Sequence, residues 1–430
     1  MISQSGNVNV ATNNTSNVRD HALAPYWCSL SSPRSIFFLY YLAQELYVSA
    51  NIVSDQGEMA TKPHVVIIGG SYSGTGVAHA LLKRLPTIKV SLINTSESFY
   101  FNVAAPRALA RPSEVPLDKV LIPIASAFKQ YSTSQFEFVH GTVTSVNDSR
   151  KTVTVGAGKH VTYDYLVIAS GSTTPSTLAP QCTPTKATST DDLAQRIKAS
   201  QSAIAAAKTI CIGGNGAVGV ELAGEIAEAY TSKKVVLVSA TPDPLPNLRA
   251  AAGAAATSQL TKLGVEIVKN RKVDSAEFDS SAGQWTVKLN DGDSLTFDLY
   301  ISAVGVLPNS SFLSHHLVTD EGWVIVNENL AAIGARHVYA LGDITSNKTW
   351  TALSIEGQVK TVVANLVADI NGGGVKQPYK KGTRPLIITP IGKKGGTGQM
   401  WFFVPWSFMV GFIKSKDYFV PKASTFISAK

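Results

Sequence analysis

The sequence TICIGGNGAVGVELAGEIAEAY, residues 209–230, decides the fold class of this chain. Thr209–Ile212 is a short apolar run typical of a buried strand, and the pattern from Ala217 to Tyr230 predicts a helix. Between them stands a complete G-x-G-x-x-G motif made by Gly214, Gly216 and Gly219. Glycine permits a tight turn and lets the backbone approach a pyrophosphate, which the helix N-terminus attracts. We therefore expect a dinucleotide-binding unit here, continued by a strand at Lys234–Val238.

Ser239 occupies the position after that strand at which such units usually carry an acid. An Asp or Glu there holds the ribose hydroxyls of NADH and repels the 2′-phosphate of NADPH. Serine brings no charge to repel a 2′-phosphate, so the choice between NADH and NADPH stays open. Ser239 itself is a candidate cofactor contact. The candidate partners for a 2′-phosphate are Lys233, Lys234 and Arg249.

A second, less complete glycine turn, GGSYSG at residues 69–74, follows the apolar run Val65–Ile68. Ser71 replaces the middle glycine, and a small side chain there still permits close approach of a phosphate. Asn94 stands at the end of the next expected strand, where an acid is usual, and can still accept a hydrogen bond. A degenerate structural turn is the alternative interpretation. The candidate ligand contacts of this turn are Gly69, Gly70, Ser71, Gly74 and Asn94.

Three further segments help to identify the kind of protein to which the two turns belong. They are YDYLVIASGS (163–172), YISAVGVLPN (300–309) and VYALGDI (338–344). With the turns, they resemble the two-dinucleotide-domain flavoprotein reductases. Within these, the likeness is to the apoptosis-inducing-factor-like group, which includes the ferroptosis-suppressor quinone reductases. The resemblance extends from about His64 to Ala423 and includes IKSKD at 413–417.

The resemblance implies an α/β fold with two nested Rossmann-like domains. The FAD-binding domain would comprise residues 59–180 and 296–371, interrupted by an NAD(P)H-binding domain at 181–295. A basic, aromatic C-terminal region would follow at 372–430. The implied cofactors are FAD and either NADH or NADPH.

The resemblance also assigns roles to single residues. Asp343 takes the position of the family's aspartate on the FAD ribityl chain, and Glu221 and Gln358 resemble residues close to the flavin. For Glu221, the alternative is an inward-facing acid paired with a lysine; for Gln358, it is an ordinary residue on a helix face. The other implied cofactor contacts are Arg107, Ser170, Gly171, Gly305 and Gly342.

The cysteines set a limit on the chemistry. Cys28, Cys182 and Cys211 are far apart, so neither a Cys-x-x-Cys motif nor a metal site is expected. The family's disulfide reductases carry a C-x4-C pair, and Phe99–Leu109 contains no cysteine. We therefore expect hydride to pass from NAD(P)H to flavin and then to an external small molecule. A quinone is the favoured acceptor.

Two other functions remain open at this point. One is a tailoring oxidoreductase that acts on a small aromatic metabolite. The other is an apoptosis-inducing-factor-like signalling or nucleic-acid-binding flavoprotein, which we regard as the less favoured interpretation. We expect a cytoplasmic protein, with a mitochondrial location or association with a membrane surface as the alternatives. The sequence does not indicate the oligomeric state.

The C-terminal region concentrates the chain's positive charge. Residues 372–430 hold nine Lys and Arg384 against the single acid Asp417, a net charge of +9, whereas the whole chain carries +8. The same region contains WFFVPWSFMVGFI at 401–413. Aromatic and basic residues together favour peripheral contact with a membrane, although these rings could instead pack against the two domains. Residues 1–58 show no periodic pattern over most of their length and are expected to be a dispensable leader.

Overall fold

The computed structural model describes residues 62–175, 185–187, 192–347, 352–382 and 385–428. The leader 1–58 lies outside the described residues, as do Cys28, Cys182 and Arg384.

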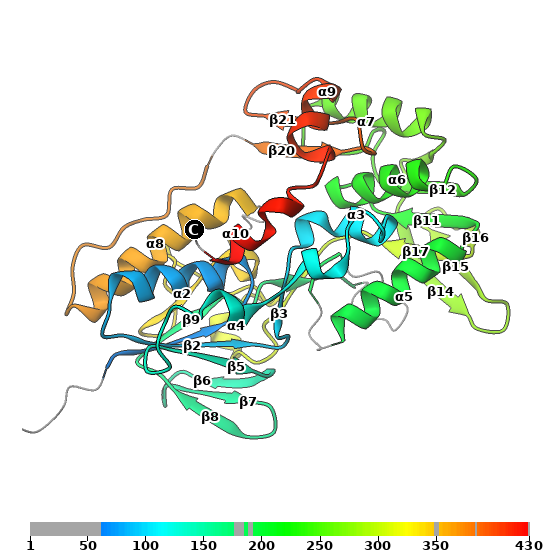
Figure 1. Ribbon diagram of the computed structural model, residues 1–430. Helices are drawn as coiled ribbons and strands as arrows, with labels where there is room; N and C mark the ends of the chain where they lie inside the picture. The colour runs from blue at the N-terminus through cyan, green and yellow to red at the C-terminus, as the bar shows by residue number, and fades with distance from the viewer. Residues whose placement is uncertain (1–61, 176–184, 188–191, 348–351, 383–384, 429–430) are drawn as a thin grey trace, which may run out of the picture. The chain divides into compact units, whose positions relative to one another are not determined.

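The first domain contains a five-stranded parallel sheet and a smaller antiparallel one. Their strands are β1 (His64–Ile68), β2 (Lys89–Asn94), β5 (Phe136–His140), β6 (Val143–Asn147), β7 (Thr152–Val155), β8 (Lys159–Thr162), β9 (Tyr165–Ile168) and β19 (Val338–Ala340). The parallel sheet has the order β19-β9-β1-β2-β5 (Figure 1). The apolar run that predicted β1 lies at its centre, with four of five residues buried.

Side chains of β1 alternate between the two faces of this sheet, as strand geometry requires. Val65 and Ile67 pack under the helices α2 (Tyr72–Arg84) and α8 (Ala352–Ile370). Val66 faces the opposite side, where the sheet β6-β7-β8 covers it. Smaller elements between β2 and β5 are β3 (Ser98–Tyr100), α3 (Ala105–Ala110), β4 (Leu121–Pro123) and α4 (Ile124–Ala127).

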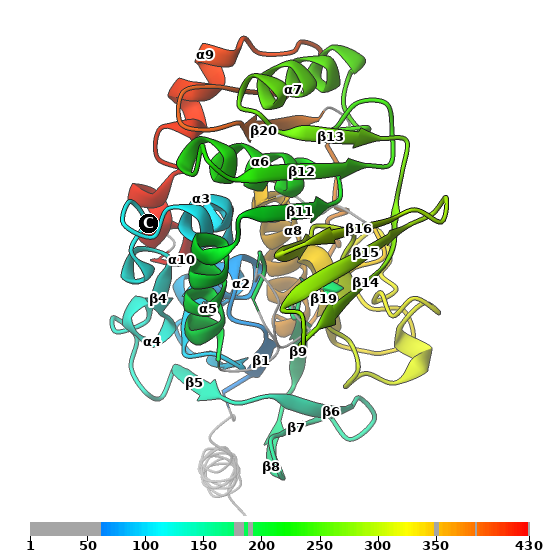
Figure 2. The ribbon, with the colours of Figure 1, turned by 90° about the vertical axis from the view of Figure 1, so that its right-hand side faces the viewer.

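The second domain repeats this plan. Its strands are β11 (Thr209–Gly213), β12 (Lys234–Ser239), β13 (Glu266–Lys269), β14 (Val273–Asp279), β15 (Gln284–Leu289), β16 (Ser294–Phe297) and β17 (Leu299–Ser302). The parallel sheet has the order β13-β12-β11-β17, and β14-β15-β16 form an antiparallel sheet. The helices are α5 (Leu193–Ala206), α6 (Ala217–Ala229) and α7 (Ala250–Lys262). Figure 2 shows these helices on one side of the parallel sheet and the antiparallel strands on the other.

The chain leaves the second domain later than expected. The expected boundary at residue 295 would place β17 in the first domain, yet β17 pairs in parallel with β11. The crossing therefore follows Ser302. The two crossing segments, β10 (Ser172–Thr173) and β18 (Leu307–Pro308), pair with each other in antiparallel register.

The C-terminal region is folded against both domains. Its elements are β20 (Leu386–Pro390), β21 (Gly396–Met400), α9 (Ser407–Val410), the π-helix η6 (Gly411–Ser415) and α10 (Ala423–Ser428). The β20–β21 hairpin packs on α6 and α7, whereas α10 packs on α2. Val410, Tyr418 and Ile427 are buried at these contacts. The packing interpretation therefore holds for part of this region.

In each domain, a central strand of the parallel sheet is followed by a glycine turn and a helix. This arrangement confirms the expected α/β class with two nested Rossmann-like domains. Among the described residues, no helix has both the length and the apolar character needed to cross a bilayer.

Candidate functional site

Each glycine turn begins with a glycine held in a left-handed conformation. Gly69 has φ +110° and Gly214 has φ +116°, values that residues with a side chain rarely adopt. A Cβ at Gly69 would also clash with the carbonyl oxygen of Ala169, and a Cβ at Gly214 with that of Ala303. The two turns therefore share one backbone construction at equivalent places in the two sheets.

The last glycine of each motif allows the helix to pack directly on the turn. A Cβ on Gly74 would overlap the carbonyl oxygen of Gly69, and a Cβ on Gly219 would overlap that of Gly214. The first turn of each helix therefore lies close to its strand end. The unpaired N–H groups at this helix end attract an anion such as pyrophosphate.

The middle position tests whether a dinucleotide fits. Gly216 has φ −73° and ψ −179°, which any residue can adopt, and a Cβ there would meet nothing within 4 Å. Neither the backbone nor a protein neighbour requires this glycine, so close approach of a ligand accounts for it best. Ser71 has a similar extended conformation, φ −94° and ψ −162°, and its side chain is exposed. The first turn thus presents a hydroxyl where the second presents open space.

A cavity of about 500 Å³ opens beside the second turn. Asn215 and Gly216 of the turn line it, together with Gly305 from the segment after β17. Ser239 is fully buried behind Asn215. Its hydroxyl accepts a hydrogen bond from Asn215 Nδ2 at 2.9 Å. Ser239 thus supports the turn through Asn215. The cofactor contact expected of Ser239 stays a prediction.

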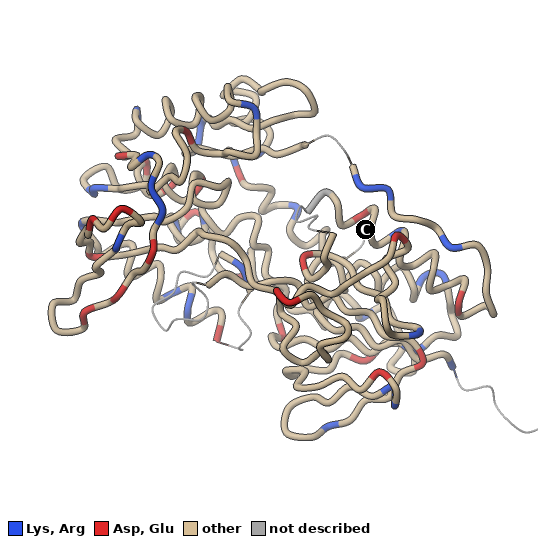
Figure 3. Tube along the Cα trace, turned by 180° about the vertical axis from the view of Figure 1, so that it is seen from behind, with Lys and Arg blue, Asp and Glu red and all other residues tan. Residues whose placement is uncertain are grey.

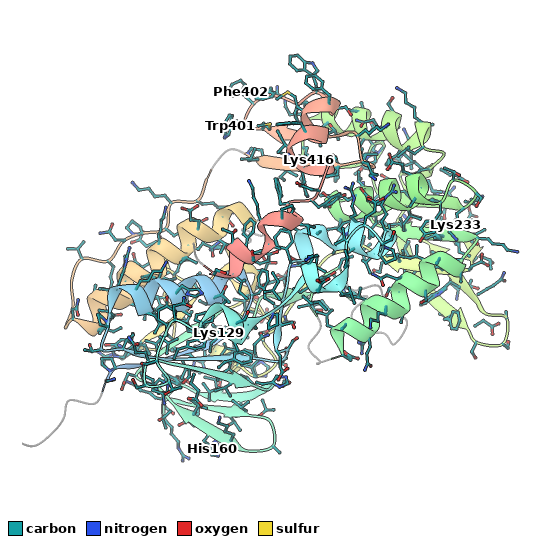
Figure 4. All side chains as sticks on the ribbon, viewed as in Figure 1. Lys129, His160, Lys233, Trp401, Phe402 and Lys416 are labelled. Carbon is teal, nitrogen blue, oxygen red and sulfur yellow. The ribbon has the colours of Figure 1, made fainter. Side chains whose placement is uncertain are left out.

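The basic residues expected near a 2′-phosphate lie elsewhere. Lys234 begins β12 and Ser239 ends it, which separates them by roughly 16 Å. Lys234 pairs with Glu266 at 3.0 Å, and Lys233 donates to the carbonyl oxygen of Ala205 (Figure 4). Arg249 binds the carbonyl oxygen of Phe402.

Two other basic residues do line the cavity, Arg271 and Lys272. The backbone N–H of Arg271 donates to the carbonyl oxygen of Ser239 at 2.9 Å, which places this pair beside the usual acid position. The Arg271 guanidinium is paired with Asp291 and Asp293. Lys272 is the cavity's other cationic side chain.

In the first domain, Asn94 supports the glycine turn directly. Its Oδ1 accepts a hydrogen bond from the backbone N–H of Gly70 at 2.8 Å, and its Nδ2 donates to the carbonyl oxygen of Ser96. One amide therefore holds the turn to the end of β2. Whether Asn94 and Gly70 also contact a cofactor stays a prediction.

Asp343 is held from three directions. Gln358 is fully buried, and its Oε1 accepts a hydrogen bond from the backbone N–H of Gly342 at 2.7 Å, which fixes the segment before Asp343. The carboxylate accepts a hydrogen bond from Ser172 Oγ at 3.2 Å and is paired with Lys186. Gln358 is thus a positioning residue for the A-x-G-D segment, a role that neither sequence interpretation described.

Ser170 and Gly171 lie where the chain leaves the first domain. The Ser170 hydroxyl donates to the carbonyl oxygen of Asn309 at 2.7 Å, and the Asn309 amide donates back to the carbonyl oxygen of Ser170 at 2.9 Å. This reciprocal pair links the two crossing segments. A Cβ on Gly171 would meet nothing within 4 Å, but its φ of +67° already favours glycine.

Glu221 is buried on α6 and forms an ion pair with a lysine from the C-terminal region. Lys414 Nζ donates to Glu221 Oε1 at 2.7 Å and to the carbonyl oxygen of Ile388 at 3.3 Å. Burial raises the pKa of Glu221, and the nearby Lys414 charge opposes that rise. Lys414 belongs to the π-helix η6, a rare conformation that occurs frequently at functional sites.

Arg107 has a structural environment. Its Nε and Nη2 donate to the Glu225 carboxylate at 3.0 and 2.6 Å, and its Nη1 donates to the carbonyl oxygen of Lys416. Tyr418 lies beneath the guanidinium at 4.7 Å. The pair is fully buried and joins α3, α6 and the C-terminal region. Protein groups occupy all three guanidinium nitrogens, so the geometry does not favour the cofactor contact expected of Arg107.

Residues 63–365 match the family model described as pyridine nucleotide-disulphide oxidoreductase, which is more than half of the chain. The chain belongs to this family. As a member of it, the protein binds FAD and NAD(P)H, and the two glycine turns account for two dinucleotides.

Individual proteins extend the family match. The oxidoreductase ptaL of Pestalotiopsis fici is 37% identical over 83% of this chain and 96% of its own length. Human ferroptosis suppressor protein 1 is 27% identical over 83% of this chain and 94% of its own length, which confirms the resemblance expected from the motifs. The sulfide:quinone oxidoreductase of Aquifex aeolicus has the same fold, with a TM-score of 0.68 and 17% identity over 86% of this chain and 93% of that one.

This pyridine nucleotide-disulphide oxidoreductase has no cysteine between Phe99 and Leu109, the position of the redox pair in the family's disulfide reductases. Within the described part of the chain, Cys211 is a free cysteine, fully buried in β11. Burial raises the pKa of its thiol to about 12. Cys211 is therefore a packing residue and not a candidate electron acceptor.

Sequence reasoning missed several residues of this oxidoreductase. Lys186 lies in a polar segment without periodic pattern, and Asn309 was noted only as part of a matching segment. Lys414 likewise appeared only within IKSKD, although a lysine partner for Glu221 was foreseen. One sequence signal could have indicated Arg271 and Lys272 as cavity residues. They form a basic pair one residue after the end of β13, the strand that pairs with β12.

Proposed function

We propose that the protein transfers hydride from NAD(P)H through FAD to an external small-molecule acceptor, with a quinone as the favoured acceptor. The observation that carries this proposal is the combination of two glycine turns of the same backbone construction with no redox cysteine pair between Phe99 and Leu109. The first feature supplies places for donor and flavin. The second removes the protein disulfide as the next electron carrier.

The first domain would hold FAD through residues already in place. Bound FAD would accept hydride from the nicotinamide and pass two electrons on to the acceptor. The N-terminus of α2, with Gly69 and Ser71, would bind the pyrophosphate. Asp343, fixed by the bond between Gln358 and Gly342, would accept hydrogen bonds from the ribityl hydroxyls. Lys186 would then remain the counter-charge for Asp343.

The second domain would hold the nicotinamide donor in the cavity beside Gly216. Because the residue at the usual acid position is Ser239, no carboxylate there repels a 2′-phosphate. We propose that both donors bind and that Lys272 contributes more to the binding affinity for NADPH than to that for NADH. Arg271 contributes less, because Asp291 and Asp293 already neutralise its charge.

The Glu221–Lys414 pair would act on the reaction itself. Glu221 is two residues after Gly219, at the start of the helix that carries the second turn. Its carboxylate keeps the Lys414 ammonium in one position, and Glu221 and Ile388 use two of that ammonium's three N–H groups. We propose that the positive charge of Lys414 favours transfer of negative charge into this site.

A two-stage experiment tests the proposal. In the first stage, the purified full chain is titrated anaerobically with NADH or NADPH while the flavin absorbance is followed. In the second, quinones and small aromatic aldehydes and ketones, which can be reduced at the carbonyl group, are added to the reduced protein. Return of the oxidised flavin spectrum with quinones supports the proposal. Reoxidation by the aromatic aldehydes and ketones alone would point to an aromatic metabolite, and no reduction by either donor would contradict redox function.

A further inference from the structure

Five aromatic side chains between residues 401 and 412 are exposed to solvent. Their exposed fractions lie between 49% and 75%, whereas most aromatic residues of the described chain are buried or half-buried. Soluble proteins rarely expose large apolar side chains in one cluster unless the cluster binds something. We call these residues the aromatic patch: Trp401, Phe402, Trp406, Phe408 and Phe412.

The patch is held firmly by the fold. Ser407 Oγ donates to Gln259 at 2.8 Å and accepts from the backbone N–H of Gly396 at 3.0 Å. Val410 and Ser415 are fully buried on the inner side of α9 and η6. The rings of Trp406 and Phe408 stack on the outer side, with centroids 6.0 Å apart. The outward direction of the rings is therefore built into the backbone, and Figure 4 shows Trp401 and Phe402 at the edge of the molecule.

Basic side chains accompany the patch. Lys416 Nζ lies 4.7 Å above the ring of Phe412, and the backbone of Lys394 lies against Gly411, the residue before Phe412. No described acid lies within ion-pair distance of Lys394, Lys416 or Lys422, whereas Lys393 and Lys414 both have acidic partners. Further Lys residues occur along the segment between α8 and β20, which has no acidic residue (Figure 3).

The chemistry of the patch fits a lipid surface better than a nucleic acid. A platform for single-stranded nucleic acid combines stacking rings with a basic groove that follows the phosphate backbone. The segment 401–412, which carries the patch, contains no Lys or Arg. In the segment 401–412, Ser407 is the polar side chain, and its hydroxyl is already bonded within the protein. Tryptophan and phenylalanine beside lysine suit the boundary between acyl chains and anionic headgroups.

We propose that the aromatic patch docks this protein on the surface of an anionic phospholipid bilayer. The rings enter the interface between headgroups and acyl chains, and Lys394 and Lys416 lie against the headgroup phosphates. Since the described helices do not span a bilayer, the contact is peripheral. The inference does not depend on the proposed redox reaction.

The test is sedimentation of the full chain with vesicles of phosphatidylcholine alone or with one quarter phosphatidylserine, at physiological salt. The variant Trp406→Ala/Phe408→Ala should lower the partition coefficient at least tenfold, and Lys416→Ala should lower it only on the anionic vesicles. The control is Lys129→Ala, which removes an exposed lysine remote from the patch (Figure 4) and should leave binding unchanged. FAD content serves as the measure of folding for every variant.

Several outcomes would overturn the proposal. Equal vesicle binding by Trp406→Ala/Phe408→Ala and the wild type would place the contact elsewhere, for instance in the leader. Absence of vesicle binding by the wild type would show that the aromatic patch does not dock on an anionic bilayer. A wild-type dimer that the same double variant converts to a monomer, without vesicle binding, would identify a second copy of the chain as the partner. Binding of single-stranded DNA in preference to vesicles would identify a nucleic acid.

Discussion

Glu221 Oε1 and Lys414 Nζ lie 2.7 Å apart, although 193 residues separate them along the chain. Glu221 is the fifth residue of α6, the helix that follows the second glycine turn, and Lys414 is in the π-helix of the C-terminal region. The C-terminal region is therefore joined to the helix that follows the second glycine turn, and it also carries exposed side chains. Its segment η6 turns the lysine inward while Phe412, two residues earlier, faces solvent.

Replacement of Glu221 by Gln should lower the rate of flavin reduction by NAD(P)H at least tenfold while FAD stays bound. The amide can still accept a hydrogen bond from Lys414, but without the Glu221 carboxylate the buried ammonium is no longer stabilised in its charged form, so the positive charge that favours the reaction is lost. Stopped-flow absorbance measures the rate. Glu228→Gln is the matched control, because Glu228 lies on the same helix and pairs with Arg111 at 2.6 Å. Similar rates in Glu221→Gln and the wild type would reduce the pair to a structural contact.

The glycines of the second turn offer a matched pair of alanine variants. Gly216→Ala should fold normally, because its Cβ meets no protein atom, yet it should raise KM for NADH and NADPH about tenfold by obstructing the ligand. Gly219→Ala should instead destabilise the protein, because its Cβ overlaps the Gly214 carbonyl. Thermal unfolding and steady-state kinetics separate the two effects. A Gly216→Ala variant with unchanged KM would argue against a dinucleotide at this turn.

Lys272→Ala should raise KM for NADPH about tenfold, equivalent to about 1.4 kcal/mol, and leave KM for NADH within twofold. The physical reason is loss of a positive charge that lines the cavity beside the buried Ser239. Lys269→Ala is the control, since Lys269 pairs with Asp243 and does not line the cavity. Equal changes for both donors would show that Lys272 does not recognise the 2′-phosphate.

The buried side chain of His79 should make the folded protein less stable in mild acid. Its ring is fully buried, stacks on Phe128 and bonds the carbonyl oxygen of Ile427 at 2.9 Å. Burial lowers the pKa of His79 from 6.5 to about 4. The unfolded chain therefore binds this proton first, and stability falls as the pH drops from 6.5 towards 4, by up to about 3 kcal/mol.

Thermal midpoints at pH 7.5 and pH 5 for the wild type and His79→Gln test this prediction. Glutamine can donate to the Ile427 carbonyl but does not titrate in this range. The variant should lose less stability than the wild type between the two pH values. An identical loss in both proteins would assign the acid sensitivity to other groups.

The two Rossmann-like domains were predictable because their signals are local. In each, an apolar strand, a glycine turn and a helix follow one another within about 22 residues, so the pattern at 209–230 determines its own structure. The boundary at 295 was misplaced because β16 and β17 are separated by only one residue, Asp298, and only the pairing of β17 with β11 distinguishes their sheets.

The site was less predictable because its contacts join distant segments. The position of Asp343 followed from the family motif, but its partner Lys186 depends on how a loop folds back. Arg107 was expected at a cofactor because its segment resembles the family's. Its buried partner Glu225 is 118 residues away, and removal of one member of such a pair costs about 3–5 kcal/mol.

The most direct test of the account is the anaerobic titration of the purified full chain with NADH and NADPH. The account predicts a yellow protein with one FAD per chain, whose flavin absorbance is lost on addition of a nicotinamide donor and returns with a quinone. A protein that purifies without flavin, although it is folded, would show that Ser71 and Asn94 do not sustain the FAD site and would contradict the central claim.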